Sequence, residues 1–158
     1  MTQKPFNKVL AANRGEIAIR IFRACYDLGL HTVAMYSNED TGGQFRTHAD
    51  EAYLIGENKS PVGAYLDIPA IIDLAKRRGV DAIHPGYGFL SENSTFAKLC
   101  RENDIVFIGP APEVIDRMGN KSQARKTMME AGVPVVPGTK EPVHAPEEAL
   151  AKARDVGW

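Results

Sequence analysis

Five short apolar runs alternate with segments of helical periodicity up to residue 109, and this alternation restricts the possible folds more than any other feature. The runs are Val9–Ala12, Thr32–Tyr36, Tyr53–Ile55, Ala82–His84 and Ile105–Ile108. They are continuously apolar, as strands buried on both faces are. Strands that alternate with helices form βαβ crossovers and a parallel sheet. The sequence therefore predicts an α/β fold, a parallel sheet with helices on both faces.

Helix boundaries are marked by capping residues and glycines. Apolar residues recur at helical spacing before Gly29, which stands where that helix would end. Asp67 and Ser91 are predicted to cap two further helices, which end near Gly79 and Asn103. The polar residues 38–46 are predicted to form a loop.

The rhythm changes after Pro110. Three helices and a proline-rich extended segment are predicted beyond it: Glu113–Met118, Asn120–Ala131, Val133–Gly138 (extended) and Pro146–Val156. The final Gly157–Trp158 resembles the approach to another strand. We therefore expect two parts, a sheet domain at residues 1–110 and the incomplete beginning of a second domain at residues 111–158, cut from a longer protein.

Composition excludes several classes of function. The 158 residues carry a formal net charge of −1, which does not suggest nucleic acid or a membrane surface as a partner. No apolar segment approaches the length of a membrane span, and Met1–Lys8 lacks the apolar run of a secretory signal. Cys25 and Cys100 lack metal-site spacing and are expected to be small buried residues. The cytoplasm is the default compartment.

The stretch Asp81–Asn93 is the best candidate for a ligand site, because it predicts a buried strand, a glycine-rich turn and a helix start. Gly86 and Gly88 allow the backbone to approach a ligand closely, at the end of a strand where open α/β sheets bind ligands. A dinucleotide fingerprint needs a third glycine, and Ser91 stands there. The fold is therefore Rossmann-like, but NAD binding is not supported. Tyr87 is either an aromatic plug or a ligand contact.

Three other polar residues each allow two interpretations. His84 is either an acid–base or ligand group, or a residue hydrogen-bonded in place to shape the turn. Glu92 either serves a ligand site or complements a helix dipole. Lys121 follows Gly119–Asn120 at a helix start. The earlier glycine of a P-loop is missing, so this stretch does not form one. Lys121 is then either a phosphate contact at a helix start or a solvated lysine. No catalytic triad, paired carboxylates or HExxH motif supports hydrolytic chemistry.

Charged residues lie three or four apart on the first helix, opposite its apolar stripe: Glu16, Arg20, Arg23 and Asp27. They form either a solvated face with i,i+4 ion pairs or an arginine-rich partner interface.

Several of these stretches resemble the N-terminal region of biotin-dependent carboxylases. Ala12–Ala18 and His84–Asn93 are similar to signature stretches of the biotin carboxylase component. Phe107–Pro110, Met118–Lys121 and Gly132–Gly138 follow in that family's order. The resemblance covers essentially the whole chain.

The resemblance implies a pre-ATP-grasp domain followed by the truncated start of an ATP-grasp domain. Such enzymes use MgATP to activate bicarbonate as carboxyphosphate and carboxylate protein-linked biotin. It implies that Lys121 contacts ATP phosphate and that Tyr87 lies near biotin. Arg20 and Arg23 resemble residues of a dimer contact. The family usually has aspartate where Asn120 stands, a change that keeps a short polar residue at the helix start.

The resemblance also implies cofactors and partners for the full-length enzyme. The cofactors are ATP, biotin and Mg²⁺ (or Mn²⁺), and none is expected to be fully bound by this chain. The catalytic residues and metal ligands are expected outside it, so the fragment alone is expected to be inactive. Its partners would be the remainder of the ATP-grasp domain, the biotin carboxyl carrier domain and a second copy of the biotin carboxylase part.

Within this family, Asn38–Gly42 and Ala49–Gly56 resemble the pyruvate carboxylase branch, which carboxylates pyruvate to oxaloacetate. Three alternatives stay open. The first is the biotin carboxylase subunit of acetyl-CoA carboxylase or another acyl-CoA carboxylase. The second is a different ATP-grasp ligase, against which the Gly86–Asn93 motif argues. The third is a non-catalytic assembly module.

Overall fold

A computed structural model of the chain describes residues 6–139, 143, 145–155 and 157. The chain divides into two compact units, Met1–Pro112 and Glu113–Trp158. The first unit contains the sheet, and each unit is described by itself.

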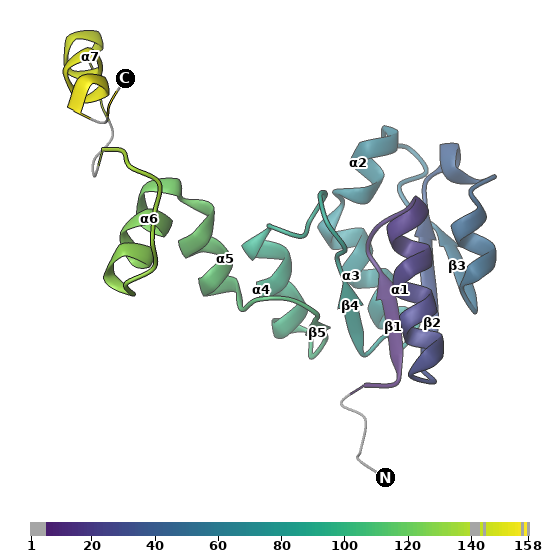
Figure 1. Cartoon of the computed structure of the whole chain (residues 1–158). Coiled ribbons are helices and arrows are strands. Elements are labelled where there is room, and N and C mark those ends of the chain that lie inside the picture. The colour runs from purple at the N-terminus through teal and green to yellow at the C-terminus, as the bar shows by residue number, and fades with distance from the viewer. Residues whose placement is uncertain (1–5, 140–142, 144, 156, 158) are drawn as a thin grey trace. The chain divides into compact units, whose positions relative to one another are not determined.

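Five parallel strands form a single sheet in the order β3-β2-β1-β4-β5 (Figure 1). The strands are β1 (Lys8–Ala11), β2 (His31–Tyr36), β3 (Glu51–Leu54), β4 (Ala82–His84) and β5 (Val106–Phe107). The α/β fold with a parallel sheet is thus confirmed. From β1 the chain proceeds outward to β3, then crosses back to β4 on the other side of β1. In doubly wound sheets, ligands bind at such a switch point, here between the ends of β1 and β4.

Helices cover both faces of the sheet. The helical elements of this unit are α1 (Gly15–Asp27), η1 (Asn38–Asp40), η2 (Gln44–His48), α2 (Pro61–Tyr65), α3 (Ile68–Arg77) and α4 (Ser94–Glu102), of which η1 and η2 are 3₁₀ helices. Core residues of α1 and η2 pack on one face. Those of α2, α3 and α4 pack on the other. Figure 1 shows α1 in front of the strands.

The two cores follow the two-residue period of the strands. Val9 and Ala11 of β1 pack with Phe22 of α1. Leu10, between them in sequence, packs on the opposite face with Ile71 of α3. All five side chains are almost completely buried, which explains why β1 is a continuous apolar run from Val9 onward. Both cysteines, Cys25 and Cys100, are buried and unpaired, as predicted.

One predicted helix cap is wrong. Ser91 lies in a turn, where its backbone N–H donates to the carbonyl of Gly88 at 2.9 Å. Asn93 caps α4 instead, because its side chain accepts a hydrogen bond from Phe96 N at 2.8 Å. The Asp67 cap of α3 is confirmed, since its carboxylate accepts from a backbone N–H of the first turn. Residues 38–46, predicted as a loop, include η1 and the start of η2.

The remaining helices are α5 (Pro112–Gly119), α6 (Lys121–Glu130) and α7 (Pro146–Asp155). Asn120 caps α6, accepting a hydrogen bond from Gln123 N at 3.0 Å. Arg125 of α6 donates to the carbonyls of Val136 at 2.5 Å and Gly138 at 3.3 Å, so the extended segment lies against this helix. Among the described residues, no helix combines the length and apolar character needed to cross a membrane.

Candidate functional site

The loops that follow β1 and β4 are joined by one buried side chain. The amide nitrogen of Asn13 donates to the carbonyls of Pro85 and Tyr87, both at 2.8 Å. Its amide oxygen accepts from the backbone N–H of Arg14 at 2.9 Å. Only 3% of Asn13 is exposed. Because buried carbonyls need donors, this amide fixes the path of the β4 loop at the switch point. No sequence pattern singled out Asn13 as a site residue.

Glycine is required at position 86 for two reasons. Its φ is +68°, in the left-handed region, and a Cβ there would lie 2.7 Å from the amide nitrogen of Asn13. Gly88 has the same φ of +68°. The tight glycine turn predicted from the sequence is confirmed, and what approaches its backbone closely is Asn13.

His84 shapes this turn. Its Nδ1 accepts a hydrogen bond from the backbone N–H of Gly86 at 3.0 Å, so Nδ1 carries no proton. Burial lowers the pKa of His84, which favours the same neutral form. The geometry supports the interpretation of a histidine hydrogen-bonded in place.

Tyr87 stands at the exposed end of this loop. It is 64% exposed, which does not fit a buried plug. Its hydroxyl donates to one carboxylate oxygen of Glu16 at 3.3 Å, and Arg20 pairs with the other oxygen at 3.5 Å. Glu16 of α1 therefore connects two residues that the sequence singled out, whereas Arg23 is exposed on the same helix.

A largely apolar groove of about 560 Å³ lies beside Tyr87. Its lining includes Arg20, Ile17 and Ile21 of α1, together with His84 at the end of β4. The lining thus combines mostly apolar side chains with a tyrosine and an arginine. Such a combination suits a small ligand that has an apolar body and a polar head.

A second polar cluster surrounds Asp40, near the ends of β1 and β2. Arg14 pairs with the Asp40 carboxylate at 3.1 Å. The hydroxyl of Tyr65 donates to the same carboxylate at 2.7 Å and accepts from the backbone N–H of Ser37 at 3.3 Å. Burial, and then the bond to Asp40, raise the pKa of Tyr65 well above its usual range, so the phenol stays protonated.

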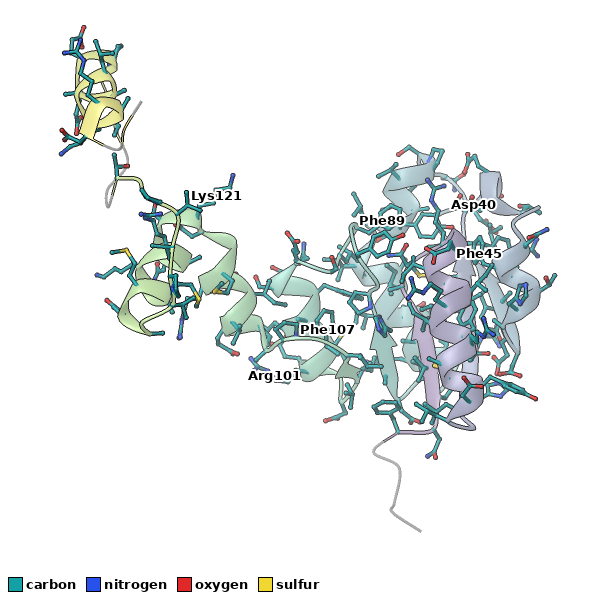
Figure 2. The ribbon with its side chains drawn as sticks, in the orientation of Figure 1. Asp40, Phe45, Phe89, Arg101, Phe107 and Lys121 are labelled. Carbon is teal, nitrogen blue, oxygen red and sulfur yellow. The ribbon has the colours of Figure 1, made fainter. Side chains whose placement is uncertain are left out.

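Phe89 connects the glycine loop to this cluster. Its ring stacks on Tyr65 with 5.1 Å between centroids and 24° between planes. The guanidinium carbon of Arg14 lies 5.6 Å from the Tyr65 ring centre and 5.8 Å from that of Phe89. Figure 2 shows the labelled Asp40 and Phe89 at the same end of the sheet. The β4 loop is therefore held at Asn13 on one side and at Phe89 on the other.

Lys121 lies in the other compact unit, as the first residue of α6. It is exposed (Figure 2). The first turn of α6 carries no acidic side chain, so this ammonium and the N–H groups that Asn120 does not cap present positive charge there. That arrangement suits an anionic group. Among the described residues, no cluster of three or more His, Cys, Asp or Glu side chains could hold a metal ion.

The profile of the biotin carboxylase N-terminal domain matches residues 5–115. The chain belongs to the biotin carboxylase family. Mitochondrial pyruvate carboxylase from Rattus norvegicus is 60% identical to it over 155 residues, 98% of this chain and 13% of the relative. Biotin carboxylase from Halalkalibacterium halodurans is 55% identical over 154 residues, 97% of this chain and 34% of the relative. The resemblance to biotin carboxylases, and to pyruvate carboxylase in particular, is confirmed.

A solved structure shares the fold of this biotin carboxylase region. The biotin carboxylase domain dimer of Hydrogenobacter thermophilus 2-oxoglutarate carboxylase, in complex with MgADP, ADP and bicarbonate, superimposes with a TM-score of 0.91 at 49% identity. The match covers 99% of this chain and 34% of that one. The chain therefore spans about one third of a biotin carboxylase, and a smaller share of the pyruvate carboxylases it matches.

Proposed function

We propose that this chain is the N-terminal part of the biotin carboxylase component of a pyruvate carboxylase. The observation that carries the proposal is the 60% identity to the rat pyruvate carboxylase over 98% of the chain. In the complete protein, a bicarbonate oxygen attacks the γ-phosphorus of ATP and ADP leaves. The carboxyl group of the resulting carboxyphosphate would replace the proton on N1 of biotin, with phosphate leaving and taking up that proton. It would then replace a methyl proton of pyruvate, which returns to N1, giving oxaloacetate.

Two residues of the chain have proposed contacts in this reaction. The ammonium of Lys121, with the free N–H groups of α6, binds the nucleotide phosphates and offsets their charge. Tyr87 lies beside biotin. Its exposed hydroxyl and the apolar groove next to it fit a ligand with an apolar body and a polar ureido head.

The other groups of the active site would come from the remainder of the protein. The related Hydrogenobacter domain was crystallised with MgADP and bicarbonate. We propose the same cofactor class here: ATP with Mg²⁺ or Mn²⁺, held by metal ligands of the completed ATP-grasp domain. The biotin carboxyl carrier domain supplies biotin. The exposed face of α1 with Arg20 and Arg23 contacts a second copy, as a charged patch rich in arginine can.

One alternative has an observation of its own. The 55% identity to the Halalkalibacterium biotin carboxylase would also suit a separate subunit that serves an acyl-CoA carboxylase. The two functions share the carboxylation of biotin and differ only in the final acceptor. An assay with pyruvate and with acetyl-CoA as alternative acceptors separates them.

Steady-state ATP cleavage by the full-length protein tests the proposal. We expect cleavage that requires bicarbonate and is accelerated by free biotin. A rate of ATP cleavage that does not change with biotin would contradict a biotin carboxylase and favour a different ATP-grasp ligase.

A further inference from the structure

The backbone of Phe89 adopts a conformation that its side chain disfavours. Its φ is +42°, in the left-handed region, where a residue with a Cβ is strained. Such a conformation persists only where the surroundings hold it, and it concentrates at functional sites. Phe89 lies two residues after Tyr87, directly after the second glycine of the turn. The strained residue, Phe89, therefore lies next to the turn that carries the exposed Tyr87.

Three residues, Tyr65, Asp40 and Arg14, form a clamp around the Phe89 ring. Tyr65, on which its ring stacks, is completely buried, and its hydroxyl bonds to Asp40 at 2.7 Å. Arg14, paired with Asp40, lies near both rings. A guanidinium close to two aromatic rings and an ion pair are each attractive, and together they fix the ring in one place.

The turn is held by hydrogen bonds from His84 and Asn13 and not by side chains of its own glycines. Gly86 and Gly88 lack the side chains that would restrict their backbone angles. Tyr87, placed between them, makes one long hydroxyl contact, at 3.3 Å to Glu16. The position of the Tyr87 side chain therefore depends on Asn13, which holds the Tyr87 carbonyl at 2.8 Å, and on Phe89, which fixes the chain two residues later.

We propose that Phe89 is a positioning residue for biotin, which it influences through Tyr87 and without touching the ligand. The inference rests on the proposed function. It predicts that removal of the Phe89 ring loosens Tyr87 and weakens the use of biotin. The use of ATP is unaffected, because Lys121 belongs to the other compact unit.

The experiment compares three variants of the full-length protein. Phe89→Leu removes the stacked ring, and Phe89→Tyr retains it. Phe107→Leu is the matched control: this ring is also half-buried against the same core, but it packs edge-to-face on Phe96 with 5.9 Å between centroids. The KM for free biotin and the KM for ATP are measured from steady-state ATP cleavage.

We expect Phe89→Leu to raise the KM for biotin about threefold to tenfold, which corresponds to the energy of one aromatic pair, with little change in the KM for ATP. Phe89→Tyr should restore the parent value, and Phe107→Leu should leave the KM for biotin unchanged. An unchanged KM for biotin in Phe89→Leu would overturn the inference. So would an equal rise in Phe107→Leu, which would indicate a general packing effect.

If Phe89→Leu does not fold, Arg14→Gln tests the same positioning role. It removes the guanidinium and the ion pair with Asp40 and leaves both rings, so the KM for biotin should rise while the KM for ATP stays constant. Equal changes in both constants would overturn the inference. A parent protein without biotin-dependent cleavage overturns the proposed function, and this inference with it. An active parent with unaffected variants overturns the inference alone.

Discussion

Asn13 shows how much of the site depends on a single residue. Asn13→Ala leaves the buried carbonyl of Pro85 and the part-buried carbonyl of Tyr87 without this donor, and an unsatisfied buried acceptor costs about 1–3 kcal/mol. We expect the free energy of unfolding of this chain, measured in urea, to fall by about 2–4 kcal/mol. Asn38→Ala is the control, because Asn38 is exposed, and it should change stability by less than about 0.5 kcal/mol. Equal losses in the two variants would contradict the role of Asn13.

His84 should make the stability of the fold depend on pH. Burial lowers its pKa below the ordinary 6.5, so the unfolded chain takes up the proton first. The stabilisation is therefore fully present above about pH 6.5 and is lost as the pH falls through the folded-state pKa. Protonation of Nδ1 would also break its bond from Gly86 N.

We expect the Tm of the chain to fall as the pH is lowered from about 7 to about 5, and less steeply in His84→Asn. The asparagine carbonyl offers an acceptor near the position of Nδ1 but does not titrate. The other three histidines, His31, His48 and His144, are present in both proteins and cancel in the comparison. Parallel pH profiles in the two proteins would show that His84 is not the titrating group.

Within the site, the contacts between residues close in sequence were the predictable part. Gly86 and the His84 bond lie within one turn of the chain, so the sequence predicted the glycine turn and offered the His84 bond as one of two interpretations. The bonds of Asn13 reach residues 72 and 74 positions away, which no local pattern shows. A usable signal existed, since Asn13 is a polar residue directly after a buried strand, at the edge where ligand loops gather.

The C-terminal ends of α3 and α4 are each followed by a residue in the left-handed conformation. Gly79 follows α3 and Asp104 follows α4, both at positive φ, and in each case the next N–H reaches back to a helix carbonyl at 2.9 Å. Glycine adopts this conformation without strain. Asp104→Gly should therefore raise the free energy of unfolding by about 0.5–1 kcal/mol, and Gly79→Asp should lower it by about 1 kcal/mol. Urea unfolding measures both, and changes of the same sign would contradict the explanation.

The start of α6 gives a prediction about ATP. Lys121→Ala in the full-length protein should raise the KM for ATP about tenfold, because it removes a charge-assisted contact to phosphate. Lys126→Ala is the matched control, since Lys126 is exposed later on the same helix. Unchanged ATP kinetics in Lys121→Ala, or an equal loss in both variants, would refute the assignment of Lys121.

The elements with an apolar pattern were predictable, and those without one were not. The five strands and the helices α1, α3 and α4 follow from apolar patterning. α2 (Pro61–Tyr65), with its glycine, has no periodic signal, and it contributes Tyr65 to the clamp on Phe89. η1 brings Asp40 to the same cluster through i,i+3 bonds within a polar stretch. Apolar patterning does not predict the strand order either, because tertiary packing decides which strands pair.

For the whole molecule, our proposal is that the chain provides one part of a larger active site. It spans 34% of the Halalkalibacterium biotin carboxylase, and its described residues contain no cluster of metal ligands. We therefore expect no ATP cleavage by this chain alone under conditions in which the full-length protein is active. Measurable turnover by the isolated chain would show that catalytic groups lie within it.

The most direct test follows the carboxyl group. The full-length protein is incubated with labelled bicarbonate, MgATP and free biotin, and the label on biotin is measured with ATP omitted as the control. We predict that label is transferred to biotin only when ATP is present, with one ADP formed for each carboxyl group transferred. ADP formation without any label on biotin would contradict the assignment of this chain to a working biotin carboxylase.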